Sequence, residues 1–239
     1  MTVSPDDTIG DLASRFPDTI PVFQRLRVEF CCDGQRRVGD LCRERRIAFD
    51  ELAASLQAAV TAPRRARPDW AGRSLSDLMA HLVEAFHEPL REQLPRLHAM
   101  AVKVQAHDDD SRHALAVVLF ELGRFRAQLE AHLSEEERDL FALVQRAESG
   151  NQQPDDARRF QELRAVLEAE HREAGDALHV LSQATDRYSP PPRACTTVRA
   201  LYRGLHELEQ FMQLHIHLEN NALFPRAASL LSAARIERS

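Results

Sequence analysis

The most informative segment of the chain, residues 215–227, reads HIHLENNALFPRA. It continues a stripe of apolar residues that recur every three or four positions: Val198, Leu201, Leu205, Leu208 and Met212. The next two turns of the stripe carry His215 and Glu219, before the pattern returns to Leu223. Because residues four apart share one face of an α-helix, we expect this histidine and this glutamate to project into the core.

Three more segments repeat the helical pattern, at about residues 74–106, 111–148 and 155–186, and the last helix begins near residue 194. Helices of about 30 residues are about 45 Å long, and the short connections between them predict an antiparallel four-helix bundle. The chain has only eight glycines and is rich in good helix formers, which favours an all-α fold. Pro89 and Pro95 predict kinks in the first helix, and Pro225 predicts a kink or interruption in the fourth.

A small helical domain is expected before the bundle. Residues 1–61 contain several short helical patterns around a turn-like Cys31-Cys32-Asp33-Gly34. Residues 62–73 hold two prolines and four arginines, a composition typical of a linker. We therefore predict a small domain at 1–61, a linker at 62–73 and the bundle at 74–239.

The composition excludes several classes of protein. The 239 residues carry a net charge of −6, which is unfavourable for a protein whose main role is to bind nucleic acid. No apolar run approaches the roughly 18 residues of a membrane span, and the first residues lack the apolar core of a signal peptide. Four cysteines are too few for a disulfide scaffold. We expect a cytoplasmic protein that binds neither nucleic acid nor a membrane.

Inward-facing polar residues recur in all four predicted helices. The second helix continues its stripe through His132 and Glu136, the third carries His171, and the first carries His87 at the edge of its apolar face. With the segment at 215–227, six polar side chains are expected in the core: His87, His132, Glu136, His171, His215 and Glu219. Five other histidines fall off the stripes and are predicted to be solvated: His98, His107, His113, His206 and His217.

A metal centre is the simplest explanation for the six inward side chains. A lone buried carboxylate is costly, and no lysine or arginine occupies the same stripes. Six nitrogen and oxygen donors suffice for two ions and leave room for a bridging oxide or hydroxide and an open position. Imidazole combined with carboxylate favours iron over zinc or manganese. One histidine–glutamate pair at this spacing is more often a surface pair, so the prediction rests on its repetition.

A second ligand set can be drawn on the same helices. Glu84 and Glu168 each precede a histidine by three residues, which is the Glu-x-x-His motif of ferritin-like carboxylate bundles. With the two stripe glutamates they would form a four-glutamate, two-histidine site. That set leaves His132 and His215 unexplained, so the histidine-rich set is preferred.

Six stretches of the chain match one known family. They are Phe30–Gly34, His87–Pro95, His132–Glu137, Glu170–Gly175, Pro190–Thr197 and His215–Ala227. In these stretches the chain resembles the iron–sulfur cluster repair di-iron proteins (the RIC family, also called YtfE or ScdA), which have a hemerythrin-like bundle and a small ScdA-type N-terminal domain. The resemblance covers nearly the whole chain. It departs from the family at Asp33, where members often carry glycine, and at Pro89, which follows His87 by two residues.

The resemblance implies roles for the candidate residues. The four inward histidines would be imidazole ligands, Glu136 and Glu219 would bridge two irons in an oxo- or hydroxo-bridged centre, and Glu170 would be a carboxylate near them. The family implies a cytoplasmic homodimer, induced by nitric oxide or oxidative stress, that helps to repair damaged iron–sulfur proteins by supplying iron. Alternatives are a nitric oxide or dioxygen scavenger or sensor, and a turnover enzyme such as a nitric oxide reductase.

Cys31 and Cys32 are neighbours in the chain. Their Cα atoms are about 3.8 Å apart, which is shorter than the usual span of a disulfide. A bond between them would be strained, so partner exchange or iron transfer is the functional interpretation. The structural alternative is that two small residues pack in a short helical domain. Cys42 and Cys195 are predicted to be structural.

Overall fold

The computed structural model describes residues 2–26, 28, 30–31, 34–61, 70, 72–105 and 112–236. Within these ranges the regular structure is helical, apart from an isolated bridge between Thr8 and Arg37, so the all-α prediction is confirmed. The chain forms two compact units, Met1–Ser74 with Gln213–Ala227 and Leu75–Met212 with Ala228–Ser239. No helix of the described part has the length and apolar character needed to cross a membrane. Most of the predicted linker at 62–73 lies outside the described residues.

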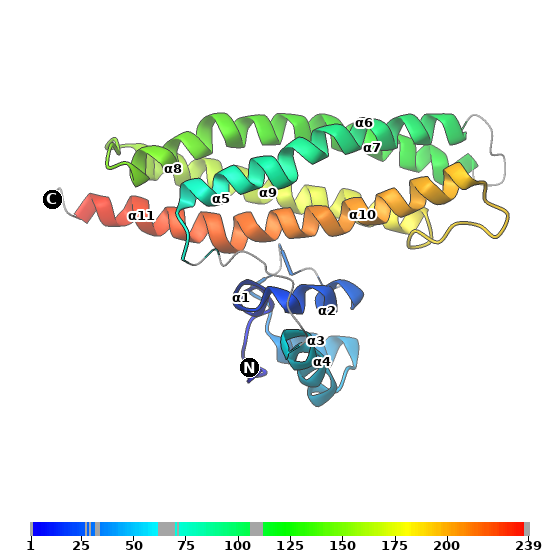
Figure 1. The fold of residues 1–239 in the computed structure, drawn as a ribbon, viewed down its shortest axis with the longest axis horizontal. Helices are drawn as coiled ribbons and strands as arrows, with labels where there is room; N and C mark the ends of the chain where they lie inside the picture. The colour runs from blue at the N-terminus through cyan, green and yellow to red at the C-terminus, as the bar shows by residue number, and fades with distance from the viewer. Residues whose placement is uncertain are drawn as a thin grey trace. The chain divides into compact units, whose positions relative to one another are not determined.

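Four long helical segments form the bundle (Figure 1). The first consists of α5 (Leu75–Leu82), η2 (Val83–His87) and α6 (Glu88–Gln105). The second consists of α7 (Arg112–Glu135), η3 (Glu136–Leu140) and α8 (Phe141–Glu148). The third is α9 (Asp156–Ala184), and the fourth consists of α10 (Thr196–Leu218), η4 (Glu219–Leu223) and α11 (Phe224–Ile236). Because α5 packs against α8 and α6 against α7, the first two segments run antiparallel, as the bundle prediction requires.

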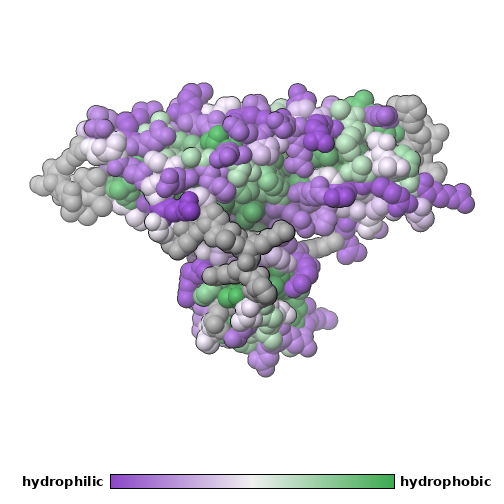
Figure 2. Space-filling model, in the orientation of Figure 1, coloured by the Kyte–Doolittle hydropathy of each residue, from purple (hydrophilic) through white to green (hydrophobic). Residues whose placement is uncertain are grey.

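The predicted apolar stripes are buried in the bundle. Each stripe contributes side chains that are at most 2% exposed, among them Leu82, Phe125, Leu167 and Leu208. Burying a side chain of this size contributes roughly 1.5–3 kcal/mol, so the repeated stripe explains why these helices pack side by side. The outward surface of the helices visible in Figure 2 is largely hydrophilic.

Among the described residues, three of the four segments contain a π-helical turn of five residues: η2, η3 and η4. In two of them a proline follows two positions after the turn ends, Pro89 after η2 and Pro225 after η4. In an α-helix, proline lacks the N–H donor and its ring collides with the carbonyl four residues earlier. A wider π turn relieves that collision. The expected disturbances at Pro89 and Pro225 therefore take the form of π turns, whereas α6 continues through Pro95.

The small helical unit has its own hydrophobic core. Its helices are α1 (Ile9–Arg15), η1 (Pro17–Thr19), α2 (Ile20–Arg25), α3 (Val38–Arg45) and α4 (Phe49–Thr61). The core side chains include Ile9, Leu12, Phe23, Phe30, Leu41 and Leu56. The Gly10 N–H group donates to the Gly34 carbonyl at 2.8 Å, and a Cβ on Gly10 would lie 2.9 Å from the Gly34 Cα atom. Only glycine permits so close an approach of two backbones.

Candidate metal centre

The π turns begin or end at residues that interrupt the apolar stripes. His87 is the last residue of η2, Glu136 is the first of η3 and Glu219 is the first of η4. A π turn adds one residue to the helix and redirects the side chains around it, and such turns are frequent at functional sites. In the second and fourth segments a histidine, His132 or His215, lies one helical turn before the glutamate.

Two groups of buried donor atoms meet in the structure. Within each group the donor atoms lie within 4.8 Å of one another: the first comprises His87, Glu136, His215 and Glu219, and the second comprises His132, His171 and Glu219. In the first group His87 Nε2 lies 3.6 Å from Glu136 Oε2, and His215 Nε2 lies 2.6 Å from Glu219 Oε1. In the second group the Nε2 atoms of His132 and His171 are 3.3 Å apart. The structure thus brings together all six residues that the apolar stripes predicted to face inward.

The two groups suit metal ions by distance, burial and chemistry. Donor atoms that share an ion about 2.1 Å away are separated by roughly 3–4 Å, close to the separations within the groups. All six residues are at most 4% exposed, and two carboxylates buried this deeply need protons or cations to offset their charge. Nitrogen and oxygen donors of this kind bind iron, zinc or manganese. Glu219 belongs to both groups, whereas Glu136 belongs to the first group only.

A further carboxylate holds one histidine of each group. Glu137 Oε1 accepts from His87 Nδ1 at 2.7 Å, and Glu170 Oε2 accepts from His132 Nδ1 at 2.7 Å. With Nδ1 as the donor, each ring keeps the lone pair of Nε2 for its group. The hydrogen bond from His132 holds the pKa of Glu170 below its usual value. Burial acts to raise the pKa of Glu137, but hydrogen bonds from Arg91 and His87 lower it overall.

The family resemblance pointed to Glu170, whereas Glu137 was missed by both the resemblance and the helical periodicity. Glu135, Glu136 and Glu137 are consecutive, and helical periodicity selects one residue of such a run for the core. Because η3 begins at Glu136, the wider turn also directs Glu137 toward a histidine of the site. The one sequence signal that could have pointed to Glu137 was Arg91, a basic residue that follows His87 by one helical turn.

The alternative Glu-x-x-His ligand set is not assembled. Glu84 is exposed, and Glu168 accepts a hydrogen bond from Arg164 at 2.7 Å. Neither carboxylate belongs to the groups of donor atoms found among the described residues. The histidine-rich set is therefore the one that the geometry supports.

The prediction that His217 is solvated is wrong. Its side chain is buried, and burial lowers its pKa to about 4. Its ring centroid lies 5.4 Å from that of Phe30, and its Nδ1 lies 3.2 Å from Asn221 Nδ2. Phe30 is distant in the sequence, so the periodicity of the helix that carries His217 could not reveal this contact.

Cys31 contacts the helical segment that carries His217, and both lie in the unit formed by Met1–Ser74 and Gln213–Ala227. Cys31 is buried, and its carbonyl accepts hydrogen bonds from Asn220 at 3.2 Å and from Asn221 at 3.4 Å. Cys32 lies outside the described residues. Of the other cysteines, Cys42 is buried and Cys195 is exposed.

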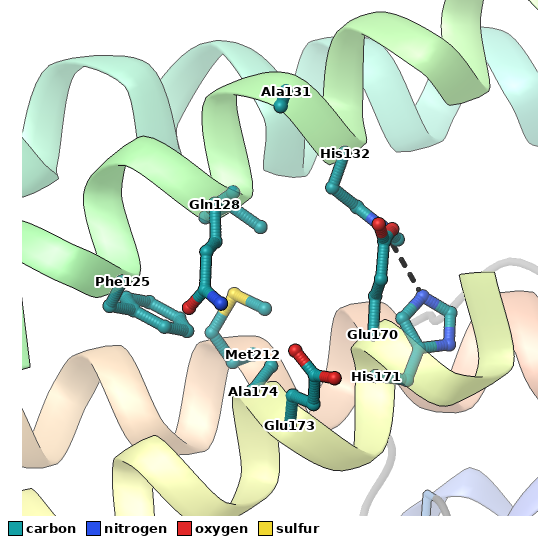
Figure 3. A pocket seen from close by; sticks show the side chains of 10 residues that line it. Phe125, Gln128, Ala131, His132, Glu170, His171, Glu173, Ala174 and Met212 are labelled. Atoms are coloured by element: carbon teal, nitrogen blue, oxygen red, sulfur yellow. Dashed lines mark hydrogen bonds and ion pairs between the residues drawn. The ribbon is translucent and has the colours of Figure 1, made fainter. Parts of the chain in front are cut away.

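A cavity of about 180 Å³ opens beside the second group of donor atoms. Its wall combines apolar side chains, such as those of Phe125 and Met212, with His132 and His171. Figure 3 shows the two histidines and Glu170 together at one end, with Phe125, Gln128 and Met212 at the other. A concave and mostly apolar site of this kind is suited to a small neutral molecule.

Comparisons with known proteins agree with this geometry. Residues 78–227 match the family described as the hemerythrin HHE cation binding domain, and residues 5–60 match ScdA_N, a domain of unknown function. The chain is 36% identical over 225 residues to the iron–sulfur cluster repair protein YtfE of Pectobacterium atrosepticum, covering 93% of this chain and 96% of that protein. The YtfE proteins of Cronobacter sakazakii and Escherichia coli are 33% and 32% identical over 222 residues, with the same coverage. The chain therefore belongs to the hemerythrin-like family of iron–sulfur cluster repair proteins that includes YtfE.

Proposed function

We propose that this chain holds two iron ions and supplies iron for the repair of iron–sulfur clusters damaged by nitric oxide or oxidative stress. The observation that carries the proposal is the meeting of buried imidazoles and carboxylates within a domain of the HHE cation-binding family. The relatives that the chain matches over 93% of its length are iron–sulfur cluster repair proteins by name, which supports cluster repair as the process.

Each candidate ligand has a distinct task in this proposal. His87 and His215 would hold one ion and His132 and His171 the other, with Glu219 between them. The carboxylate of Glu136 would offset part of the positive charge of the first ion. When bound, ferrous ions on nitrogen and oxygen donors can pass to a damaged cluster, where thiolate and sulfide offer softer ligands. The chain orients the imidazoles of His87 and His132 through Glu137 and Glu170, and burial shields the donors from bulk water.

Iron analysis of the purified protein tests whether the chain holds two iron ions. Anaerobically purified protein should contain about two irons per chain, held by its nitrogen and oxygen donors. Glu219→Ala should lose most of the iron because Glu219 belongs to both groups of donor atoms. His179→Ala is the matched control, since this histidine is exposed and bonds to Gln183. Protein that takes up only zinc, or no metal, and cannot be loaded with iron would overturn the proposal.

A reconstitution assay tests the repair. Iron-loaded protein should restore the activity of a purified [4Fe–4S] dehydratase inactivated by nitric oxide, and Glu219→Ala should restore much less. An equal amount of free ferrous salt serves as the reference. If the loaded protein does no better than the salt, iron supply by this chain is wrong even when the metal content is as expected.

A nitric oxide or dioxygen binding role is the second candidate, and the cavity beside His132 and His171 favours it. Ala174 lines this cavity, so Ala174→Phe should narrow the approach to the second ion. If gas binding is the function, this variant should keep its iron and lose cellular protection against nitric oxide. Protection at the wild-type level, with gas binding by the purified ferrous variant blocked, would favour iron supply instead.

The cysteine pair belongs to the proposal as a transfer element, acting in a cytoplasmic homodimer. Replacing Cys31 and Cys32 with serine should slow repair of the damaged enzyme and leave the iron content unchanged. Sedimentation of the purified chain tests the dimer. Repair at the wild-type rate by the serine variant would remove the cysteines from the transfer step.

A further inference from the structure

Arg91 is linked to the candidate metal centre by a shared oxygen atom. Its Nη1 donates to Glu137 Oε1 at 2.9 Å, and the same oxygen accepts from His87 Nδ1 at 2.7 Å. Arg91 lies on α6, one helical turn after His87, whereas Glu137 lies on η3. A single carboxylate therefore ties a guanidinium to the outer nitrogen of a candidate ligand.

Glu137 needs this second contact to keep its position. The Glu137 side chain is 30% exposed, so water competes for its carboxylate, and ordering such a side chain costs up to about 2 kcal/mol in conformational entropy. Arg91 is itself steadied by Glu130, whose Oε1 lies 3.5 Å from Arg91 Nε. Burial works against the charge of Arg91, but the hydrogen bond and charge of Glu137 raise its pKa overall.

His87 depends on Glu137 for its orientation. Its side chain is fully buried and its ring lies 6.0 Å from that of Phe141, measured between centroids. Packing confines the plane of such a ring, and the partner of Nδ1 determines which nitrogen faces inward. A displaced Glu137 would therefore change the direction in which Nε2 is presented.

The corresponding histidine of the other group is held differently. His132 Nδ1 bonds to Glu170, which is 37% exposed. In the part of the chain that the structure describes, the ion pair of Glu170 is with His132, and none of the ion pairs joins it to a guanidinium. The two ends of the centre thus differ by one arginine.

We propose that Arg91 is a positioning residue for the metal centre: by holding Glu137, it fixes the ring of His87 and sets the affinity for the ion that His87 binds. This inference rests on the two-metal site proposed above. It does not depend on the metal being iron or on its transfer to a cluster.

Cobalt(II) titration of the metal-free full-length protein tests the inference. Cobalt(II) binds the same nitrogen and oxygen donors, and its visible absorption reports the coordination geometry. Arg91→Gln should weaken the binding of one of the two ions by about 10-fold, as losing an outer partner of a metal ligand typically does. The absorption of that ion should change, and that of the other should not. Arg91→Lys keeps the charge and should recover part of the affinity.

The chain offers a closely matched control. In the Arg164–Glu168 ion pair the N···O distance is 2.7 Å, against 2.9 Å for Arg91 and Glu137. The side chains of Arg164 and Glu168 are 29% and 31% exposed, and those of Arg91 and Glu137 are 29% and 30% exposed. Glu168 belongs to neither group of donor atoms. Arg164→Gln should therefore bind both ions as the wild type does, while losing a comparable ion pair.

Specific results would overturn the inference. Arg91→Gln that binds both ions with wild-type affinity and spectrum removes the positioning role. If Arg91→Gln weakened the binding of both ions equally and also lowered the melting temperature of the metal-free protein, Arg91 would be a general structural residue. If the wild type bound cobalt(II) in vitro but carried no iron in cells, the proposed function would be wrong. The comparison of Arg91→Gln with Arg164→Gln in the cobalt titration would still decide the role of Arg91.

Discussion

At the scale of single residues, a buried ion pair secures the start of the helix that carries His171. Asp156 is 2% exposed, and its two carboxylate oxygens accept from Arg146 Nη2 at 2.8 Å and Nε at 3.0 Å. The backbone N–H of Gln153 donates to the same carboxylate at 3.0 Å. Asp156 also begins α9, where a negative charge is favourable because of the helix dipole.

Asp156→Asn should lower the free energy of unfolding by about 1.5–3 kcal/mol at pH 7, the range for hydrogen bonds to charged groups. The hydrogen bond from Arg146 lowers the pKa of Asp156 in the folded state. The stabilisation is therefore complete above the unfolded pKa of about 3.9 and is lost as the pH falls below it, through the lower folded pKa. Urea unfolding of metal-free wild type and variant at pH 7 and at pH 3 measures the difference.

Asp155→Asn is the control for this measurement. Asp155 is exposed and lies 3.7 Å from Arg158, so its replacement should change stability little at either pH. If the gap between wild type and Asp156→Asn were as large at pH 3 as at pH 7, the ionised carboxylate would not be its source.

At the scale of elements, the π turns connect helix geometry to the candidate metal centre. Pro89→Ala restores an N–H donor and removes the ring collision. In this variant η2 can therefore return to α-helical geometry. Because each residue of an α-helix turns by about 100°, losing the extra residue would rotate His87 away from its group. We expect metal affinity to fall by about 10-fold, with the helix content of the metal-free protein unchanged.

Pro95→Ala provides the comparison for that prediction. Pro95 lies inside α6, away from the π turns, so its replacement should leave metal affinity at the wild-type level. Circular dichroism and metal titration of both variants decide the question. Pro89→Ala with wild-type affinity would show that η2 persists without its proline.

At the scale of the whole molecule, bound metal should stabilise the fold. A ligand present at 100 times its dissociation constant adds about 2.7 kcal/mol, and for a chain of this size each kcal/mol shifts the melting temperature by about 2–4 °C. Removing the metal with a chelator should therefore lower the melting temperature by about 5–10 °C. Acidification should have the same effect, because protonated imidazoles release metal.

Scanning calorimetry of loaded and chelated protein measures this shift. Glu219→Ala, which lacks the residue common to both groups of donor atoms, should melt at the same temperature with and without metal. Equal melting temperatures for the loaded and chelated wild type would mean that the donors contribute nothing to stability through metal binding.

Sequence periodicity alone was sufficient for the all-α fold and for the burial of the six inward residues. Both follow from spacing within a single helix, because a residue that replaces leucine at a stripe position is carried into the core with the stripe. His171 illustrates this: it follows Leu167 by one turn and is 1% exposed. The resemblance to the repair family rested on the same residues, and the matched relatives agree with it.

Other features required contacts between distant parts of the chain. His217 is off its stripe, yet it is buried because Phe30 packs against it. Glu137 was indistinguishable from its neighbours until η3 directed it toward His87 and Arg91. Helical spacing is a local property that the amino-acid order carries, whereas these partners meet only when separate helices pack. For that reason the donor set could be read from the chain, and the hydrogen bonds that orient it could be found only in the folded protein.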